Sequence, residues 1–373
     1  MLVGAAMLTS ITLQNFKSFG EEQTVPLRPI TAIVGPNNSG KSNLVSLARF
    51  VRNAVEVGVV NAIDFEGGNE FVWHRPEVSG GFIRLGWNSE QGHYFCRLAY
   101  ENRGLLGQQE EVLSHVQWGN AWGNGEGGKR LLPGQNPLAP MSGLTSVLLS
   151  NGAPQHMEIV RPVILAREIK LQLAALREDA EVVPRPSLGS NGSGLAAVLG
   201  LWRGSDPERA DQLQDFVRRC LPEVRNVFVK PSPEPSFQRL WIQQTDGQQF
   251  DAEHVSDGVL FFIALAMQAI EAGPGSLLFV EEPEQSIHPR RVGMIMDLFR
   301  QVVAQRGCQV VVVTHSPVLL NELRDEPESI VLFRRGDQGT RVKQLTEMPD
   351  LLDALRDSEP GEMLANGFFD APF

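Results

Sequence analysis

The sequence predicts an α/β fold with a parallel sheet and crossover helices. A continuous apolar run at residues 30–34 ends at a glycine and leads into residues with helical spacing. A second run, at 277–280, ends in acidic residues, and a third, at 310–313, follows an amphipathic segment that stops at Gly307. Continuous apolar runs that alternate with helices are typical of strands buried on both faces of a sheet.

Composition places the chain among ordinary globular proteins. Its 373 residues are 42% hydrophobic and 21% charged, which is enough to bury a sizeable core. The net charge of -11 argues against a surface coated with positive charge for nucleic acid, although it leaves room for a local basic groove. Cys96, Cys220 and Cys308 have no metal-ligand spacing, and no apolar stretch is long enough to cross a bilayer. We therefore expect a cytoplasmic protein with free thiols and no membrane contact.

The remaining elements follow from periodicity and turn residues. A strand is expected at 11–13, and a helix begins after the glycine loop and another ends at Gly307. Ser205 and Glu208 have the spacing of a capping box. We also expect short strands between residues 55 and 100, a loop rich in Gly, Asn and Pro over 119–143, helices over 166–180 and 207–219, and a hairpin over 240–250.

Residues 35 to 42 match the pattern G-x-x-x-x-G-K-[ST] between a strand and a helix. The glycines let the backbone wind so that its N–H groups point at phosphate oxygens, and the following helix presents its positive end to the same anion. Lys41 can reach the β- and γ-phosphates, and the Ser42 hydroxyl can bind magnesium. The residues predicted to bind ATP are Gly35, Pro36, Asn37, Asn38, Ser39, Gly40, Lys41, Ser42 and Asn43.

Acidic residues and a histidine follow the other two buried strands. We assign Glu281 to the magnesium ion and Glu282 to the attacking water, since carboxylates at the mouth of such a strand lie beside the phosphate loop. His315, in Thr-His-Ser-Pro, would lie next to the γ-phosphate and donate its N–H to developing charge. The predicted catalytic residues are Lys41, Glu282 and His315, and the predicted metal ligands are Ser42 and Glu281.

Ser256, Asp257 and Gly258 precede a strongly apolar helix ahead of the acidic strand. Ser256 is well placed as the N-cap of that helix. Taken alone this is an ordinary helix start, but its position in the chain suggests more, because RecA-like and AAA+ motors carry no such signature before their acidic strand.

The order of these motifs resembles the RecF/SMC/OLD branch of ABC ATPases. It is most similar to the small stand-alone "predicted ATPase" proteins labelled AAA_21. The segments at 15–19 and 190–195 add to the resemblance, which covers the chain except for about residues 100 to 160.

The resemblance implies an ABC-ATPase head with a β-rich flank and a small inserted helical lobe. The expected divisions are 1–100 with the phosphate loop, 101–235 as the inserted lobe, and 236–373 with the signature, acidic strand and histidine. It also implies ATP and Mg2+ as cofactors and a homodimer that forms on ATP binding, in which Ser256, Asp257 and Gly258 of one copy cap the nucleotide of the other. About sixty residues follow His315, too few for a Toprim nuclease domain, so no intrinsic nuclease is expected.

Two biological roles remain open at this point. The first is a DNA-associated head in genome maintenance or phage defence, working with a separately encoded nuclease or effector. The second is a nucleotide-gated switch that binds a protein partner and makes no DNA contact. A transporter subunit is a poorer third, because the Leu-Ser-Gly-Gly-Gln signature of transporters is missing.

Three groups of residues could contact phosphate or nucleic acid, although an exposed turn, a solvated helix face and a packed loop, respectively, are at least as well supported. They are His74 with Arg75, the basic residues Arg161, Arg167, Lys170 and Arg177 on a predicted helix face, and Trp118 and Trp122 with Lys129 and Arg130.

Overall fold

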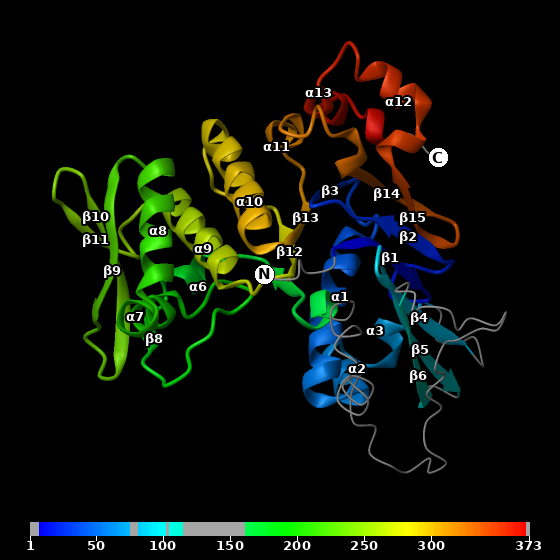
Figure 1. Ribbon diagram of the computed structural model, residues 1–373, viewed down its shortest axis with the longest axis horizontal. Coiled ribbons are helices and arrows are strands. Elements are labelled where there is room, and N and C mark those ends of the chain that lie inside the picture. Colours follow the sequence, from blue (N-terminus) through cyan, green and yellow to red (C-terminus); the bar gives the residue numbers. More distant parts are fainter. Residues whose placement is uncertain (1–6, 75–80, 102–103, 115–160, 371–373) are drawn as a thin grey trace, which may run out of the picture.

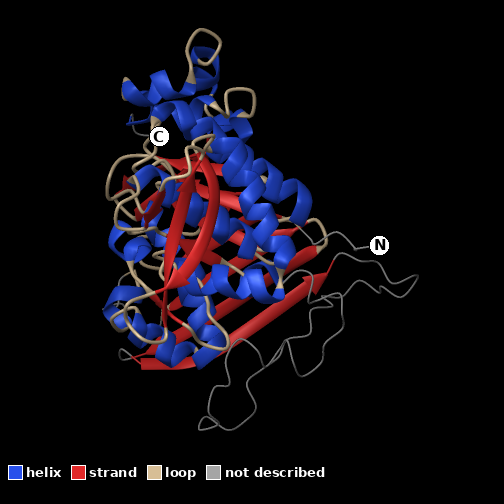
Figure 2. Ribbon diagram, turned by 90° about the vertical axis from the view of Figure 1, so that its left-hand side faces the viewer, coloured by secondary structure: helices blue, strands red, loops and turns tan. Residues whose placement is uncertain are grey.

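The computed structural model describes residues 7–74, 81–101, 104–114 and 161–370. The fold has three parts, a central sheet with an antiparallel flanking sheet on one side and a lobe on the other (Figure 1). Figure 2, seen from the lobe side, shows strands in all three parts with helices packed around them. The predicted α/β class and the β-rich flank are confirmed.

The central sheet collects strands from both ends of the chain. Its order is β15 (Gly339–Gln344), β14 (Ile330–Gly336), β3 (Ile30–Val34), β13 (Gln309–Val313), β12 (Leu277–Glu281) and β7 (Arg167–Ile169). All neighbouring pairs are parallel except β14 with β15. The three apolar runs recognised in the sequence are therefore β3, β12 and β13, and they lie side by side.

Alternation along these strands divides the core in two. Ala32, Val34 and Val312 belong to one cluster, which includes the helices α9 (Asp257–Glu271) and α10 (Val292–Arg306). Ile33 and Val313 belong to the other, which includes α1 (Lys41–Val57) and the flanking sheet. Successive side chains of a strand point to opposite faces, so a sheet covered on both faces needs apolar residues at every position.

The flanking sheet is antiparallel and reaches further along the chain than residue 100. Its order is β2 (Gln23–Pro26), β1 (Leu8–Gln14), β4 (Phe82–Ser89), β5 (Gly92–Glu101) and β6 (Gly104–Ser114). The expectation of strands throughout 55–100 is wrong for its first part. There the chain forms α2 (Val59–Phe65) and α3 (Asn69–Val72), bounded by Gly58 and Gly68, because Val59, Ala62 and Ile63 bury one helical face.

The inserted lobe contains a sheet as well as helices. Its elements are α6 (Leu173–Arg177), β8 (Ala180–Glu181), α7 (Leu195–Ser205), α8 (Pro207–Cys220), β9 (Val224–Pro231), β10 (Phe237–Gln244) and β11 (Gln249–Asp251). β10 pairs with β8, β9 and β11, all antiparallel, and the hairpin predicted over 240–250 is β10–β11. α9, the helix after the signature, packs against α6, α8 and α10 and so joins the lobe to the central sheet (Figure 1).

Two local predictions are wrong. A helix was expected over 166–180, but the first residues form β7, the edge strand beside β12, and only Leu173–Arg177 is helical. Pairing with an existing strand edge overrides the helical spacing of so short a segment. The capping box is also wrong, since Asp206 is the N-cap of α8 and accepts the bond from the Arg209 backbone N–H at 3.4 Å.

Short helices after β13 complete the chain, and they cover the end of the sheet beside β14 (Figure 1). They are α11 (Pro317–Asn321), η2 (Pro327–Ser329), η3 (Leu345–Glu347), α12 (Pro349–Ala354), α13 (Pro360–Ala365) and η4 (Phe368–Asp370), while η1 (Pro289–Arg291) directly precedes α10. Cys96, Cys220 and Cys308 are buried free thiols. Among the described residues, no helix has the length and apolar character needed to span a membrane.

The buried side chain of Gln309 ties the first strand to the central sheet. Its carbonyl oxygen accepts from the Leu8 N–H at 2.6 Å, and its amide donates to the Leu8 carbonyl at 2.9 Å. These bonds connect β13 to β1 across almost the whole sequence.

We expect Gln309→Ala to lower the free energy of unfolding by about 1–3 kcal/mol, because it leaves buried backbone groups of Leu8 without this partner. Denaturant unfolding measures the change. Gln305→Ala, at an exposed position of α10, is the matched control and should change stability by less than about 0.5 kcal/mol. Equal effects of the two substitutions would contradict the assigned role.

Candidate nucleotide-binding site

A polar cleft opens where the central strands end. Its volume is about 280 Å³, and it is lined by Asn37, Asn38, Gly40, Lys41, Ser42, Asn43, Glu281, Glu282, Val313 and His315. The strand register explains this convergence, since Glu281 of β12 lies opposite Val313 of β13, and Val313 lies opposite Ile33 of β3. Parallel strands present their carboxyl ends at one edge, where open α/β sheets bind ligands. The structure therefore brings together the motifs that follow all three strands.

The glycine loop is held in its shape from outside the cleft. Gly35 and Gly40 have φ of 147° and 105°, in the region that favours glycine. A Cβ at Gly35 would lie 2.0 Å from the Phe333 carbonyl oxygen, and one at Gly40 would lie 2.1 Å from Thr340 Oγ1. Thr340 Oγ1 also donates to the Ser39 carbonyl at 2.9 Å. The C-terminal strands β14 and β15 thus support the loop, and neither position has room for a larger residue.

Lys41 is buried with its ammonium group turned back onto the loop. Nζ donates to the carbonyl oxygens of Gly35 and Pro36 at 2.7 and 2.8 Å. Burial lowers the pKa of Lys41, while the nearby carboxylates of Glu282, Asp370 and Glu281 oppose that shift. These bonds hold the cation at the floor of the cleft, where it can meet an anionic ligand.

Glu281, the predicted metal ligand, forms an ion pair with Lys170 of the same chain. Its carboxylate lies 2.6 Å from Lys170 Nζ, and the side chain of Glu281 is 9% exposed. The hydrogen bond to Glu281 raises the pKa of Lys170. The sequence does not predict this contact, because helical spacing places Lys170 on a helix face, whereas Lys170 directly follows the edge strand β7.

Glu282, the predicted base, lies in a strained backbone conformation. Its φ is 46°, which is uncommon for a residue with a side chain. Its N–H donates to the Val313 carbonyl at 2.8 Å, which holds the turn against β13. The side chain is exposed and lines the cleft next to His315.

A further carboxylate, Glu284, joins the acidic turn to the histidine loop. Its Oε1 accepts from the Thr314 hydroxyl at 2.6 Å and from the His315 N–H at 3.3 Å. Oε2 is buried without a hydrogen-bond partner in the described part of the chain. Burial raises the pKa of Glu284, against these two hydrogen bonds. The only signal for Glu284 in the sequence is indirect, namely a third glutamate after the strand.

The donors in the cleft suit magnesium. The Ser42 hydroxyl and the Glu281 carboxylate line the same cavity, and hard oxygen donors of this kind are what Mg2+ prefers. The Lys170–Glu281 contact shows that a positive charge is already favourable beside this carboxylate. The residues present therefore fit the ion.

The signature residues do not line this cleft of their own chain. Ser256 is the exposed N-cap residue of α9, although among the described residues its side chain makes no capping bond. Asp257 Oδ1 accepts from Arg177 Nη2 at 2.7 Å. A Cβ at Gly258 would lie 2.8 Å from the Ser286 carbonyl oxygen, so the signature rests directly on the turn that follows the acidic strand.

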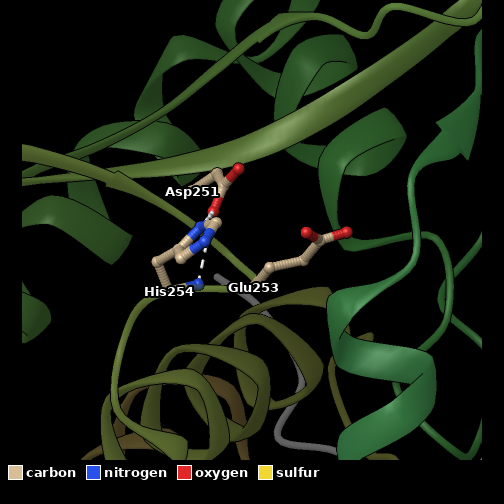
Figure 3. Close-up of side chains that lie close together, drawn as sticks. All are labelled: Asp251, Glu253 and His254. Atoms are coloured by element: carbon tan, nitrogen blue, oxygen red, sulfur yellow. Dashed lines mark hydrogen bonds and ion pairs between the residues drawn. The ribbon is translucent and has the colours of Figure 1, made fainter.

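The segment before the signature is braced by ionic contacts (Figure 3). His254 Nδ1 lies 2.6 Å from Asp251 Oδ1, as Figure 3 shows. The carboxylates of Asp251 and Glu253 lie 3.1 and 3.7 Å from the Arg239 guanidinium. Asp251, Glu253 and His254 are close enough together to hold a metal ion. Arg239 also pairs with Asp179 at 2.6 Å and so connects these carboxylates to the start of the lobe; we assign the group to fixing the loop.

The other candidate surfaces fare differently. The basic residues expected on one helix face lie in several elements, with Arg167 in β7, Lys170 after it and Arg177 in α6. That prediction is wrong, and Lys170 and Arg177 instead contact Glu281 and Asp257. His74 Nδ1 lies 2.8 Å from the Lys17 carbonyl, as expected for a structural role. Outside the described residues lie Arg75, Trp118, Trp122, Lys129, Arg130 and the loop at 119–143.

Comparisons with known families match both halves of the site. Residues 7–70 match the family described as "AAA ATPase domain". Residues 170–321 match AAA_21, described as "AAA domain, putative AbiEii toxin, Type IV TA system". The first match contains the glycine loop, and the second contains the signature, the acidic strand and His315.

Curated relatives share a short segment. The chromosome partition proteins Smc of Mycolicibacterium paratuberculosis and Mycobacterium leprae are each 53% identical over 45 residues, or 12% of this chain. That segment is 4% of each relative's length, so the chain matches only a small fraction of those proteins.

Solved SMC heads have the same fold. A structure described as the SmcHead bound to the C-winged helix domain of ScpA has a TM-score of 0.55 at 13% identity, covering 90% of this chain and 97% of the other. The Pyrococcus furiosus Smc head domain, bound to the C-terminal domain of ScpA, has a TM-score of 0.54 at 11% identity and covers 94% and 99%. The fold and site thus define a P-loop ATPase. The two family matches and the Smc similarity, taken with this fold, support an SMC/RecF-like ABC ATPase.

The charge of Glu284 predicts how the stability of the fold depends on pH. The pKa of Glu284 is higher in the folded chain than in the unfolded chain. Its contribution to folding stability is therefore fully present below the pKa of the unfolded chain, and it is lost as the pH rises through the pKa of the folded chain. Glu284→Gln keeps an oxygen for Thr314 and His315 but removes the buried charge. We expect the variant to have a higher Tm than the parent at neutral pH, and the difference should shrink toward about pH 4.

Thermal unfolding across this pH range measures the difference, with exposed Glu326→Gln as the control that should follow the parent throughout. A variant that is less stable at every pH would show that the carboxylate itself, and not an oxygen acceptor, is what the turn requires.

Proposed function

We propose that the chain hydrolyses ATP in a site completed by a second copy of itself. The observation that carries this proposal is the composition of the cleft. It gathers Lys41, Ser42, Glu281, Glu282 and His315 from three neighbouring strand ends, while the signature of the same chain lies elsewhere. A phosphate-binding cleft that is open on one side leaves the γ-phosphate with only some of its donors.

In this proposal the residues of the cleft divide the chemistry of one displacement. Glu282 accepts a proton from a water molecule whose oxygen bonds to the γ-phosphorus, and the bond from that phosphorus to the bridging oxygen breaks to release ADP. Lys41 offsets the charge on the phosphate oxygens, and His315 donates its N–H to them. Ser42 and Glu281 would hold a magnesium ion, which would offset negative charge on the phosphates.

The second half of the proposed site comes from the signature. Ser256 is exposed at the first turn of α9, whose N-terminus favours an anion, and Asp257 and Gly258 follow it. We propose that these three residues meet the nucleotide of the other copy and that ATP therefore favours a homodimer. The contacts of Arg177, Asp251 and Gly258 described above fix the loop in one position for that encounter.

For the biological role, we propose a DNA-associated ATPase in DNA repair, genome maintenance or antiviral defence, acting with a separately encoded effector. The similarity to chromosome partition proteins supports this role. The net charge of -11 favours the alternative, a nucleotide-gated switch that binds a protein and makes no DNA contact. Both roles use the same ATP-dependent pairing of heads.

Mixing two inactive variants tests the shared site. Lys41→Ala removes the phosphate-binding cation, and Ser256→Arg places a bulky side chain on the exposed signature. Each variant alone should lose most ATPase activity. In an equal mixture half of the dimers are mixed, and each mixed dimer has one site with both residues intact. Activity should therefore recover to about a quarter of the parent value if the sites are independent.

Phosphate release is measured for each variant and for mixtures at several ratios. A mixture of Lys41→Ala with Glu282→Gln is the control and should stay inactive, because each of its sites carries one defect in cis. Equal inactivity of both mixtures would count against a signature acting in trans.

The DNA role predicts that ATPase activity rises severalfold with added duplex DNA and that the rise falls away with added salt, as phosphate contacts do. Steady-state ATPase assays with and without DNA, across a salt series, measure this dependence. No response to DNA at low salt, with normal basal activity, would favour the protein-binding switch.

A further inference from the structure

The contact between Lys170 and Glu281 places a fixed positive charge beside the predicted metal ligand. Lys170 directly follows β7, and Ile169 of β7 lies opposite Val280 of β12. The next residues along the two strands, Lys170 and Glu281, are therefore neighbours by register. The Lys170 backbone N–H also donates to the Ser190 carbonyl at 2.8 Å, which fixes the start of this side chain.

The surroundings of the pair are rich in carboxylates. Glu282 follows Glu281 in the cleft, and Glu168 lies one residue before Ile169, with its side chain 10% exposed and paired with Arg49 at 3.0 Å. Burial raises the pKa of Glu168. Because Arg49 is held by Glu168 and Glu66, Lys170 is the cation that directly contacts Glu281 in the described structure.

We propose that Lys170 is a built-in counter-ion for Glu281, holding this carboxylate until a magnesium–nucleotide complex binds. An unpaired Glu281 would repel the phosphates of ATP, so the ammonium group lowers the cost of bringing the nucleotide into the cleft. The same contact competes with metal binding, since a metal ion bound to Glu281 would bring a second cation close to the ammonium group of Lys170. Lys170 would thus set how strongly ATP binding depends on magnesium.

The accessibility of the two side chains fits such an exchange. Glu281 is nearly buried, whereas the side chain of Lys170 is 54% exposed and can swing toward solvent when its partner is taken. A long exposed stem with a charged end loses little when it moves away. The Lys170–Glu281 ion pair can therefore separate, whereas Arg49 is held by two carboxylates.

The inference rests on the proposed function and is tested through binding, without turnover. The fluorescent nucleotide mant-ATP is titrated into the full-length protein in excess Mg2+ and, separately, in EDTA. The dissociation constant in EDTA divided by the dissociation constant in Mg2+ gives the magnesium dependence. Lys170→Met keeps the aliphatic stem and removes the charge, so binding should weaken in EDTA and should be unchanged or tighter with Mg2+. The ratio should rise about two- to fivefold, the effect expected of a partly exposed ion pair.

Two controls identify the source of the change. Arg84→Met removes the same charge from an exposed ion pair with Glu22 on the flanking sheet and should leave the ratio unchanged. Adding Lys170→Met to a Glu281→Gln background should also have no effect, because the carboxylate that Lys170 balances is already neutral.

Three outcomes would overturn the proposal. An unchanged or lower ratio in Lys170→Met would show that Lys170 is no counter-ion. The same rise in the Glu281→Gln background would show that it acts on the phosphates directly. Parent protein that binds no mant-ATP in either condition would refute the proposed ATP site as well, which separates the two failures.

Discussion

The parallel register of β3, β13 and β12 is the constraint on which the site depends. It places the ends of three strands from distant parts of the chain beside one another, so a glycine loop, a histidine and two glutamates share one cleft. The cost of this arrangement is electrostatic, because carboxylates and a buried lysine are brought out of water together. Pairing compensates for it: Lys41 is held by loop carbonyls, and Glu281 by Lys170.

Much of this could be predicted from the sequence because the decisive signals are local. The glycine loop, the apolar runs and the residues that follow them each carry their meaning within a short window, and all three strands were found. The signals that failed depend on pairing between distant segments. Arg167–Ile169 is a strand because β12 offers a free edge, and nothing in its own residues shows that edge. The location of Lys170 follows from the same pairing.

Glu284 illustrates another limit of sequence reasoning. A glutamate after Glu-Glu-Pro reads as part of a solvated acidic turn, yet its oxygen binds Thr314 and His315 and its second oxygen is buried. Whether a carboxylate faces water or a neighbouring loop is decided by how the two loops meet. The left-handed backbone at Glu282 turns the chain at that point and helps to direct the following residues toward β13.

The turn that follows β12 links the nucleotide cleft to the signature residues Ser256, Asp257 and Gly258. Gly258 has no room for a side chain because the Ser286 carbonyl lies against it, and Ser286 itself has a φ of 60°. The turn after the acidic strand and the signature are therefore packed against each other, so a shift of Ser286 would press on Gly258. Packed interiors transmit such shifts because they have few voids to absorb them. In the proposed dimer, this packing would connect the state of the nucleotide in one copy with the surface presented to the other.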